Sequence, residues 1–183
     1  MPVQHNQISG VKTPGYTSGV YYTTPFCHNF ITQSLSANSV YYSPIAIGSR
    51  VGILSLAARV STASAGSAVR LGIYNNNNCR PGSLILDAGT IDSTTTGVKE
   101  ITLGSTLYLN PGWYWFTHFS SGAATLDSMN GSLLTGLIGN SVVATSQVTG
   151  LRATLAYSAL PATAYLGSLL YISSCPLMWF KTA

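Results

Sequence analysis

Charged side chains are scarce in this sequence: they make up 7% of its 183 residues, and only four of them are acidic. Disorder is not the reason, because disordered chains combine high charge with low hydrophobicity, and apolar residues here reach 46%. The eight Lys and Arg residues are scattered singly, without the basic stripe that is typical of nucleic-acid binding. We therefore expect a folded protein that does not bind nucleic acid and whose charge-poor surface packs against neighbouring subunits.

Cysteine is also rare, with Cys27, Cys79 and Cys175 far apart and odd in number. No CxxC spacing occurs, so the sequence predicts neither a zinc site nor any other metal or cofactor. Buried free thiols are the favoured interpretation, and one disulfide plus a free thiol remains open. No apolar run reaches the length of about 18 residues that a membrane span needs. The N-terminal MPVQHNQISG lacks the basic and apolar segments of a signal peptide.

The shortage of carboxylates restricts catalysis. A glycosidase needs two carboxylates across one sugar bond, and Asp87 and Glu100 are a pair in neighbouring expected strands. His118 with Ser120 and Asp127 suggests a Ser-His-Asp triad, but no nucleophile elbow or oxyanion-loop signature accompanies them. We expect His118 to be a hydrogen-bonded strand residue and the protein not to be an enzyme.

Helix signals are nearly absent, whereas Gly, Ser, Thr, Val and Tyr are abundant and turn residues recur at short intervals. Short segments separated by frequent turn residues are typical of an all-β sandwich or barrel. We predict a two-sheet antiparallel β-sandwich of jelly-roll type with about nine strands. Its clearest strands are expected at 39–47, 51–60, 69–74, 83–91, 97–103, 113–119, 151–158 and 175–181.

Two of these strands carry positional information. Pro44 interrupts 39–47 and confines it to a sheet edge or a bulge, because proline donates no backbone hydrogen bond. The run WYWFTHF at 113–119 is apolar on both faces, so we expect a central strand that is covered on each side.

The strands at 51–60 and 69–74 are joined by the small-residue linker STASAGSA. If they form a simple hairpin, Arg59 lies near Arg70 on the face away from the core, since side chains alternate along a strand. Two cations side by side need an acid between them, which one of the chain's few carboxylates would supply.

Residues 1–28 differ from the rest, because Gly and Pro recur too often for a regular strand. We interpret them as an extended N-terminal docking arm, ordered only against a neighbour, and residues 29–183 as the β-sandwich domain. An extended segment adds to a neighbouring sheet edge through its backbone while alternate side chains fill pockets. The expected anchors of the arm are Tyr16, Tyr21, Tyr22 and Phe26.

Four consecutive asparagines occupy the middle of RLGIYNNNNCRPGSLILD. Asparagine tolerates positive φ and bonds nearby backbone, and Pro81-Gly82 fits the central positions of a type II turn, so the run is first a connection between strands. The alternative is a carbohydrate site in which planar amides, a guanidinium and an aromatic platform hold a glycan. Its residues would be Tyr74, Asn75, Asn76, Asn77, Asn78 and Arg80.

Several segments, among them RLGIYN…PGSLI, TGVKE and PGWYW, resemble a β-sandwich module of tailed-bacteriophage virion proteins. Such modules occur in tail-fibre, head-fibre, decoration and receptor-binding proteins, and the likeness extends from residue 29 to the end of the chain. It is a likeness of turns and strands, so it implies a fold and a setting and no catalytic residue.

The resemblance implies a structural protein on the exterior of a phage particle, a homotrimer that contacts other virion proteins of the capsid or tail. Because the module nearly fills the chain, a short fibre, head spike or decoration protein that docks by its N-terminal arm is expected. Host adhesion through exposed loops, including contact with a host-surface glycan, is a further expectation. The alternative is a carbohydrate-binding receptor-recognition module of a tail fibre.

Overall fold

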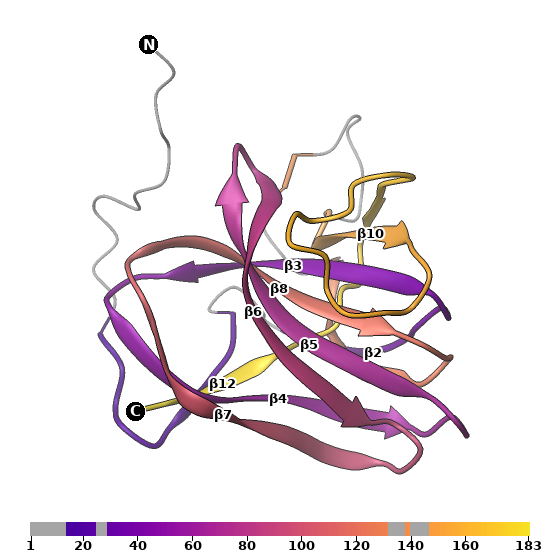
Figure 1. Ribbon diagram of the computed structural model, residues 1–183, viewed down its shortest axis with the longest axis horizontal. Coiled ribbons are helices and arrows are strands. Elements are labelled where there is room, and N and C mark those ends of the chain that lie inside the picture. The colour runs from indigo at the N-terminus through magenta and orange to yellow at the C-terminus, as the bar shows by residue number, and fades with distance from the viewer. Residues whose placement is uncertain (1–13, 25–28, 132–137, 140–146) are drawn as a thin grey trace.

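Two antiparallel β-sheets pack against each other in a computed structural model, which describes residues 14–24, 29–131, 138–139 and 147–183 (Figure 1). We name each sheet after one long or central strand. The β4 sheet contains, in order, β1 (Tyr21–Tyr22), β12 (Trp179–Thr182), β4 (Val51–Thr62), β9 (Thr125–Met129) and β2 (Phe30–Ser34), and β7 (Gly97–Leu109) also pairs with β4. The β8 sheet contains, in order, β11 (Leu170–Ile172), β10 (Gly150–Thr154), β3 (Ser39–Ile47), β8 (Gly112–Ser120), β5 (Ala68–Asn77) and β6 (Arg80–Asp92). The predicted all-β sandwich is confirmed.

The main hydrophobic core lies between the two sheets. Leu56 and Phe180 enter it from the β4 sheet, and Ile45, Leu71 and Phe116 enter it from the β8 sheet. All five side chains are buried, as the alternation of side chains along each strand requires. Burial of each large apolar side chain stabilises the fold by roughly 2 kcal/mol, so this core fixes the sheets as two layers and leaves an outer face on each.

A second apolar layer covers the outer face of the β8 sheet. Residues 155–169, which we call the strap, connect β10 to β11. Leu160 of the strap belongs to one buried cluster with Tyr74 and Trp115 of the sheet. Because β8 pairs with β3 on one side and β5 on the other, the prediction that 113–119 is a central strand covered on both faces is confirmed.

β3 pairs with β8 along its whole length, but its pairing with β10 ends at Tyr42. Pro44 lies beyond that point, where the missing proline N–H interrupts no pairing with β10. The prediction that Pro44 confines this strand to a sheet edge or a bulge is wrong, because β3 lies between β10 and β8 and pairs with β8 without a register shift. Proline is accommodated there because β10 does not extend as far as Pro44.

The hairpin considered for the strands now seen as β4 and β5 does not form, because the two strands lie in different sheets. Their arginines consequently do not meet, and each has an acid of its own: Arg59 pairs with Asp127, and Arg70 pairs with Asp87. Alternation reports which face of a strand is buried, and it does not report which strand is the neighbour.

Residues 14–24 belong to the sandwich itself. β1 pairs with β12 antiparallel, and the rings of Tyr16 and Tyr22 lie 5.7 and 5.9 Å from the ring of Phe180, centroid to centroid. The predicted arm and domain boundary are therefore wrong for this segment, because its aromatic side chains pack on the core of their own chain. Phe26, another predicted anchor, lies outside the described residues.

Candidate binding site at the tip of the β5–β6 hairpin

The asparagine run ends in a two-residue hairpin turn between β5 and β6. Asn77 pairs with Arg80, and between them Asn78 and Cys79 have φ angles of 49° and 61°. Positive φ at both central residues is the requirement of a type I′ turn, and asparagine meets it at low cost. The predicted type II turn is wrong, because Pro81 pairs within the hairpin instead of forming its bend.

Three of the residues expected to bind a glycan are occupied by structural contacts. Asn75 Oδ1 accepts a hydrogen bond from the backbone N–H of Ser83 at 2.6 Å, and Asn76 Oδ1 accepts one from Trp115 Nε1 at 2.9 Å. Tyr74 is fully buried. The predicted role of Tyr74 as an aromatic platform is therefore wrong, because its ring has no exposed face. The Oδ1 atoms of Asn75 and Asn76 are engaged within the fold, and the ligand contacts of these two amides stay a prediction.

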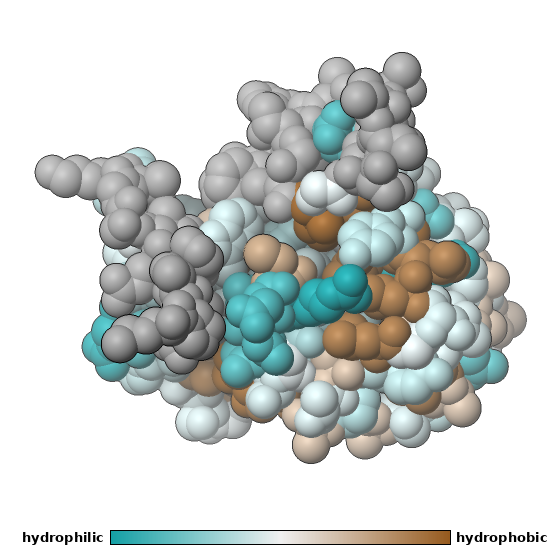
Figure 2. Space-filling model, turned by 90° about the horizontal axis from the view of Figure 1, so that it is seen from above, coloured by the Kyte–Doolittle hydropathy of each residue, from teal (hydrophilic) through white to brown (hydrophobic). Residues whose placement is uncertain are grey.

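The other residues at the tip of the hairpin, 77–80, are exposed, and Tyr171 of β11 lies beside them. Arg80 Nη2 donates to Tyr171 Oη at 3.1 Å, and the Tyr171 side chain is 52% exposed. We call Asn77, Asn78, Cys79, Arg80 and Tyr171 the tip surface. Sequence reasoning missed Tyr171, which is 91 residues from its partner. The β5–β6 hairpin extends toward the top of Figure 1, and Figure 2 shows the molecule from above. On that face, hydrophilic residues lie next to a patch of hydrophobic residues.

The guanidinium of Arg80 has no carboxylate partner among the residues that the structure describes. All four acidic residues of the sequence lie in the described part, and each is engaged elsewhere. The contacts are Asp87 with Arg70, Asp92 with Lys99, Asp127 with Arg59, and Glu100 with Tyr21 and Ser55. Arginine carries five N–H donors in a fixed fork, so the exposed guanidinium can donate to the hydroxyl or carboxylate oxygens of a ligand.

Hydrogen bonds hold two of the four carboxylates in the ionised form. The bonds from Thr94 lower the pKa of Asp92, and those from Ser55 and Tyr21 lower the pKa of Glu100. A carboxylic acid that donates a proton in catalysis needs a pKa raised toward neutral pH. The environments of Asp92 and Glu100 shift the pKa in the opposite direction, which suits structural contacts.

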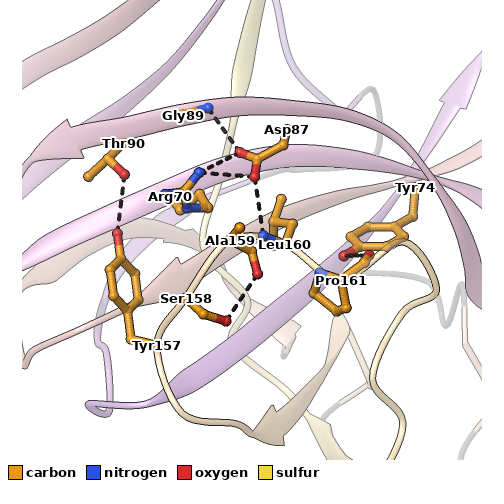
Figure 3. A network of polar contacts seen from close by, with 10 residues as sticks. All are labelled: Arg70, Tyr74, Asp87, Gly89, Thr90, Tyr157, Ser158, Ala159, Leu160 and Pro161. Carbon is orange, nitrogen blue, oxygen red and sulfur yellow. Dashed lines mark hydrogen bonds and ion pairs between the residues drawn. The ribbon is translucent and has the colours of Figure 1, made fainter.

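Figure 3 shows the polar contacts that hold the strap on the β8 sheet. Asp87 accepts hydrogen bonds from Arg70 Nη1 at 2.9 Å and from the backbone N–H of Leu160 at 3.1 Å. Tyr74 adds a bond from its hydroxyl to the carbonyl of Pro161 at 2.8 Å. The strap is therefore a fixed part of the fold, and Asp87 is one of its attachment points.

Glycine allows the strap to come this close. A Cβ placed on Gly72 would lie 2.2 Å from Leu160 Cδ1 and 2.6 Å from the carbonyl oxygen of Leu86. Distances under about 3 Å are far inside carbon–carbon contact, which is near 3.5–4 Å. The absence of a side chain at Gly72 thus creates the notch that Leu160 fills.

The residues considered for catalysis are not brought together. Asp87 lies under the strap on the outer face of the β8 sheet, whereas Glu100 and Asp127 bond to residues of the β4 sheet. His118 is fully buried in the sandwich, where burial lowers its pKa to about 4 and the nearby backbone of Leu177 opposes that shift. Neither ring nitrogen has the geometry of a hydrogen bond to a described residue, so the expectation of a hydrogen-bonded strand histidine is not confirmed. Asp87 and Glu100 are thus separated by the core and cannot flank one glycosidic bond.

The cysteines follow the sequence interpretation only in part. Cys175 is buried, and burial raises the pKa of its thiol to about 12. Cys79 is exposed in the turn, so the expectation of a buried thiol is wrong there, and Cys27 lies outside the described residues. Across 14–24, 29–131, 138–139 and 147–183, no three His, Cys, Asp or Glu side chains gather as a metal site. Within the same ranges no helix has the length and hydrophobicity to cross a membrane.

No protein-family model matches the chain, and no curated protein matches its sequence. The tip surface and the strap are consequently assigned from the residues and contacts of this chain alone.

Proposed function

We propose that this protein is a non-catalytic structural protein of a bacteriophage virion, exposed on the particle as a short fibre, head spike or decoration protein. The observation that carries the proposal is the use of the four carboxylates, each of which bonds to Arg, Lys, Tyr or Ser within the fold. A charge-poor sandwich whose acids are all structural suits a building block better than an acid–base catalyst. The segments that resemble phage modules add support, because they form the β5–β6 hairpin and the beginnings of β7 and β8.

Attachment to the particle is assigned to residues 1–13 in this proposal. Residues 14–24 are taken up by the sandwich through β1 and the aromatic contacts with Phe180. The docking arm that the resemblance implies is accordingly shorter than its predicted extent of 1–28, and Tyr16 and Tyr22 are not among its anchors.

Removal of residues 1–13 tests the proposal. We expect the shortened protein to keep the cooperative thermal unfolding of the full chain, because no described core residue is lost. We also expect it to disappear from DNA-filled particles purified on a density gradient, where the full chain is retained. Absence of the full chain from purified particles would contradict the virion role, and retention of the shortened chain would contradict the docking role of these residues.

Carbohydrate binding is a second candidate function, and the tip surface favours it. The exposed Arg80–Tyr171 pair beside Asn77 and Asn78 offers a guanidinium, an aromatic ring and two amides on one surface. These groups match what a sugar presents, hydroxyl groups for hydrogen bonds and an apolar ring face for an aromatic side chain.

A glycan array with matched variants tests the second candidate. We expect Arg80→Ala and Tyr171→Ala to lose at least about tenfold in affinity for a bound glycan, since each removes a direct contact. Arg50→Ala is the control, because Arg50 stacks on the Tyr108 ring at 4.4 Å in another Arg–Tyr pair, outside the tip surface. Equal binding by all three variants would remove the tip surface as the glycan site.

A further inference from the structure

The outer face of the β4 sheet exposes large apolar side chains. Val98 of β7 is 69% exposed, Phe30 of β2 is 55% exposed and Tyr21 of β1 is 43% exposed. Val98 pairs with Arg59 across the β4–β7 ladder, and directly paired residues point to the same side of a sheet. Phe30 contacts the ring of Trp179 on β12 at 6.1 Å, so apolar groups from several strands share this face.

The charged groups of the same face neutralise one another. Arg59 Nη1 donates to both carboxylate oxygens of Asp127, at 3.0 and 3.1 Å. Glu100 accepts a hydrogen bond from Tyr21 Oη at 2.8 Å, and Lys181 Nζ lies 5.3 Å from the centre of the Tyr21 ring. These two cations and two anions balance, and a further cation of the face, Arg50, stacks on the ring of Tyr108, which pairs with Gly52 of β4.

The pairing of charges on the outer face of the β4 sheet indicates which kind of partner can bind there. A face of one sign would repel a copy of itself, because like charges directly opposite each other are unfavourable. Here each ion already has a partner within its own chain, so an identical face can approach without leaving a charge unpaired. Nucleic acid is a poor occupant, since its binding depends on an excess of cations.

We infer that the outer face of the β4 sheet is a self-association surface on which the same face of a second copy packs about a two-fold axis. Exposed aromatic and apolar residues with few free ions resemble the core of a protein interface, which is depleted in charge and enriched in aromatic residues and Arg. Sheets that pack face to face interdigitate their side chains across about 10 Å. The inference does not depend on the virion role, because it concerns contacts between copies of the chain only.

Val98 and Phe30 are the expected anchors of this contact. Both are more exposed than Tyr21, and they come from strands on different sides of β4. In a two-fold arrangement each anchor is used twice, so a single substitution removes two contacts. A lysine at position 98 would also bring an unpaired cation into the contact beside Arg59 of its own chain.

Sedimentation of the full chain over a concentration series, with three variants, tests the inference. We expect the wild-type protein to reach twice the mass of one chain, and Val98→Lys and Phe30→Ser to raise the dissociation constant of that dimer at least about tenfold. Ile85→Lys is the matched control, because Ile85 is an exposed apolar strand residue on β6 of the other sheet. Circular dichroism and thermal unfolding of each variant show that a change in mass reflects association and not misfolding.

Each outcome of this experiment is decisive. A dimer that both face variants weaken and the control leaves intact supports the inference. A wild-type protein that stays monomeric at every concentration overturns it. A trimer, the oligomer that the resemblance to phage modules implies, also overturns it, because a two-fold contact cannot form one. A dimer weakened by Ile85→Lys and unaffected by Val98→Lys overturns it as well, because association would then use the other sheet. If Val98→Lys fails to fold, Phe30→Ser decides between these results.

Discussion

The two outer faces of the sandwich differ in whether further residues of the chain cover them. On the β8 sheet the strap fills the notch at Gly72 and buries Tyr74, so that sheet has apolar side chains on both sides. On the β4 sheet Val98 and Phe30 remain in contact with solvent, and the charged residues pair among themselves. The difference shows that one chain can make one sheet an interior layer and leave the other as a surface. Substitutions on the two faces should therefore have different costs.

The largest difference is expected between two tyrosines. Tyr74→Ala leaves a cavity under the strap and removes the bond to Pro161, so it should lower the free energy of unfolding by about 4 kcal/mol. Tyr108→Ala, on exposed β7, should cost about 0.5 kcal/mol. Chemical denaturation of both variants measures the two values. Equal losses of unfolding free energy in the two variants would contradict the distinction between the covered face of the β8 sheet and the exposed face of the β4 sheet.

The pH dependence of stability reports on the core between the two faces. The pKa of His118 is about 4 in the folded protein and 6.5 in the unfolded chain, so the unfolded state binds the proton first. The stabilisation is complete above pH 6.5 and is lost as the pH falls through 4, a decrease of about 3 kcal/mol. Denaturation curves across this range should show the decrease in the wild-type protein and a flatter profile in His118→Leu. An identical profile in both proteins would contradict the assigned cause.

The two arginine–aspartate ion pairs, one on each outer face, give a smaller difference in stability. Asp87→Asn weakens the bonds to Arg70 and to the strap backbone, in a pair whose side chains are 21% and 24% exposed, and should cost about 2 kcal/mol. Asp127→Asn weakens a pair whose Arg59 side chain is 54% exposed, so solvent screening should limit the cost to about 0.5 kcal/mol. Thermal unfolding at low and high salt measures both, and a larger loss for Asp127→Asn would reverse the comparison.

An equally small effect is expected at the exposed end of the strap. Tyr157→Phe removes the hydroxyl contact with Thr90 Oγ1 at 3.2 Å and leaves the ring contact with Phe119 in place. Because this hydrogen bond is exposed, we expect a loss of about 0.5 kcal/mol. A loss as large as that of Asp87→Asn would mean that this end of the strap holds the layer in place.

Much of the fold follows from the sequence. The alternation of apolar residues predicts most strands, and the two-sided hydrophobicity of WYWFTHF predicts the central position of β8. The edge position inferred from Pro44 does not hold, because β3 has a neighbour on each side. The sequence does not predict which sheet a strand belongs to. β4 and β5 each bury one apolar face, and that pattern is the same whether the two strands pair in one sheet or lie in opposite sheets.

The binding surface is less predictable. The central turn residues are Asn78 and Cys79, three positions before the predicted Pro81 and Gly82. The sequence offers both turns, because asparagine tolerates positive φ and Pro-Gly favours a type II turn. The sequence predicts a strand at 151–158, but β10 ends at Thr154 and the strap begins at residue 155. The attachment of the strap depends on Gly72 and Asp87, which are distant from it along the chain. Tyr171 reaches Arg80 only through that folding of the strap, so no local pattern indicates the pair.

Native-state hydrogen exchange of the strap tests the difference between the two faces most directly. The backbone N–H of Leu160 bonds to Asp87, and that of Ala164 bonds to the carbonyl of Gly82 at 2.8 Å. We expect both amides to exchange nearly as slowly as those in the centre of β8, because they open only with the sandwich. Exchange of these amides at the rate of an exposed loop, while β8 stays protected, would show that the strap is not part of the interior and would contradict the account.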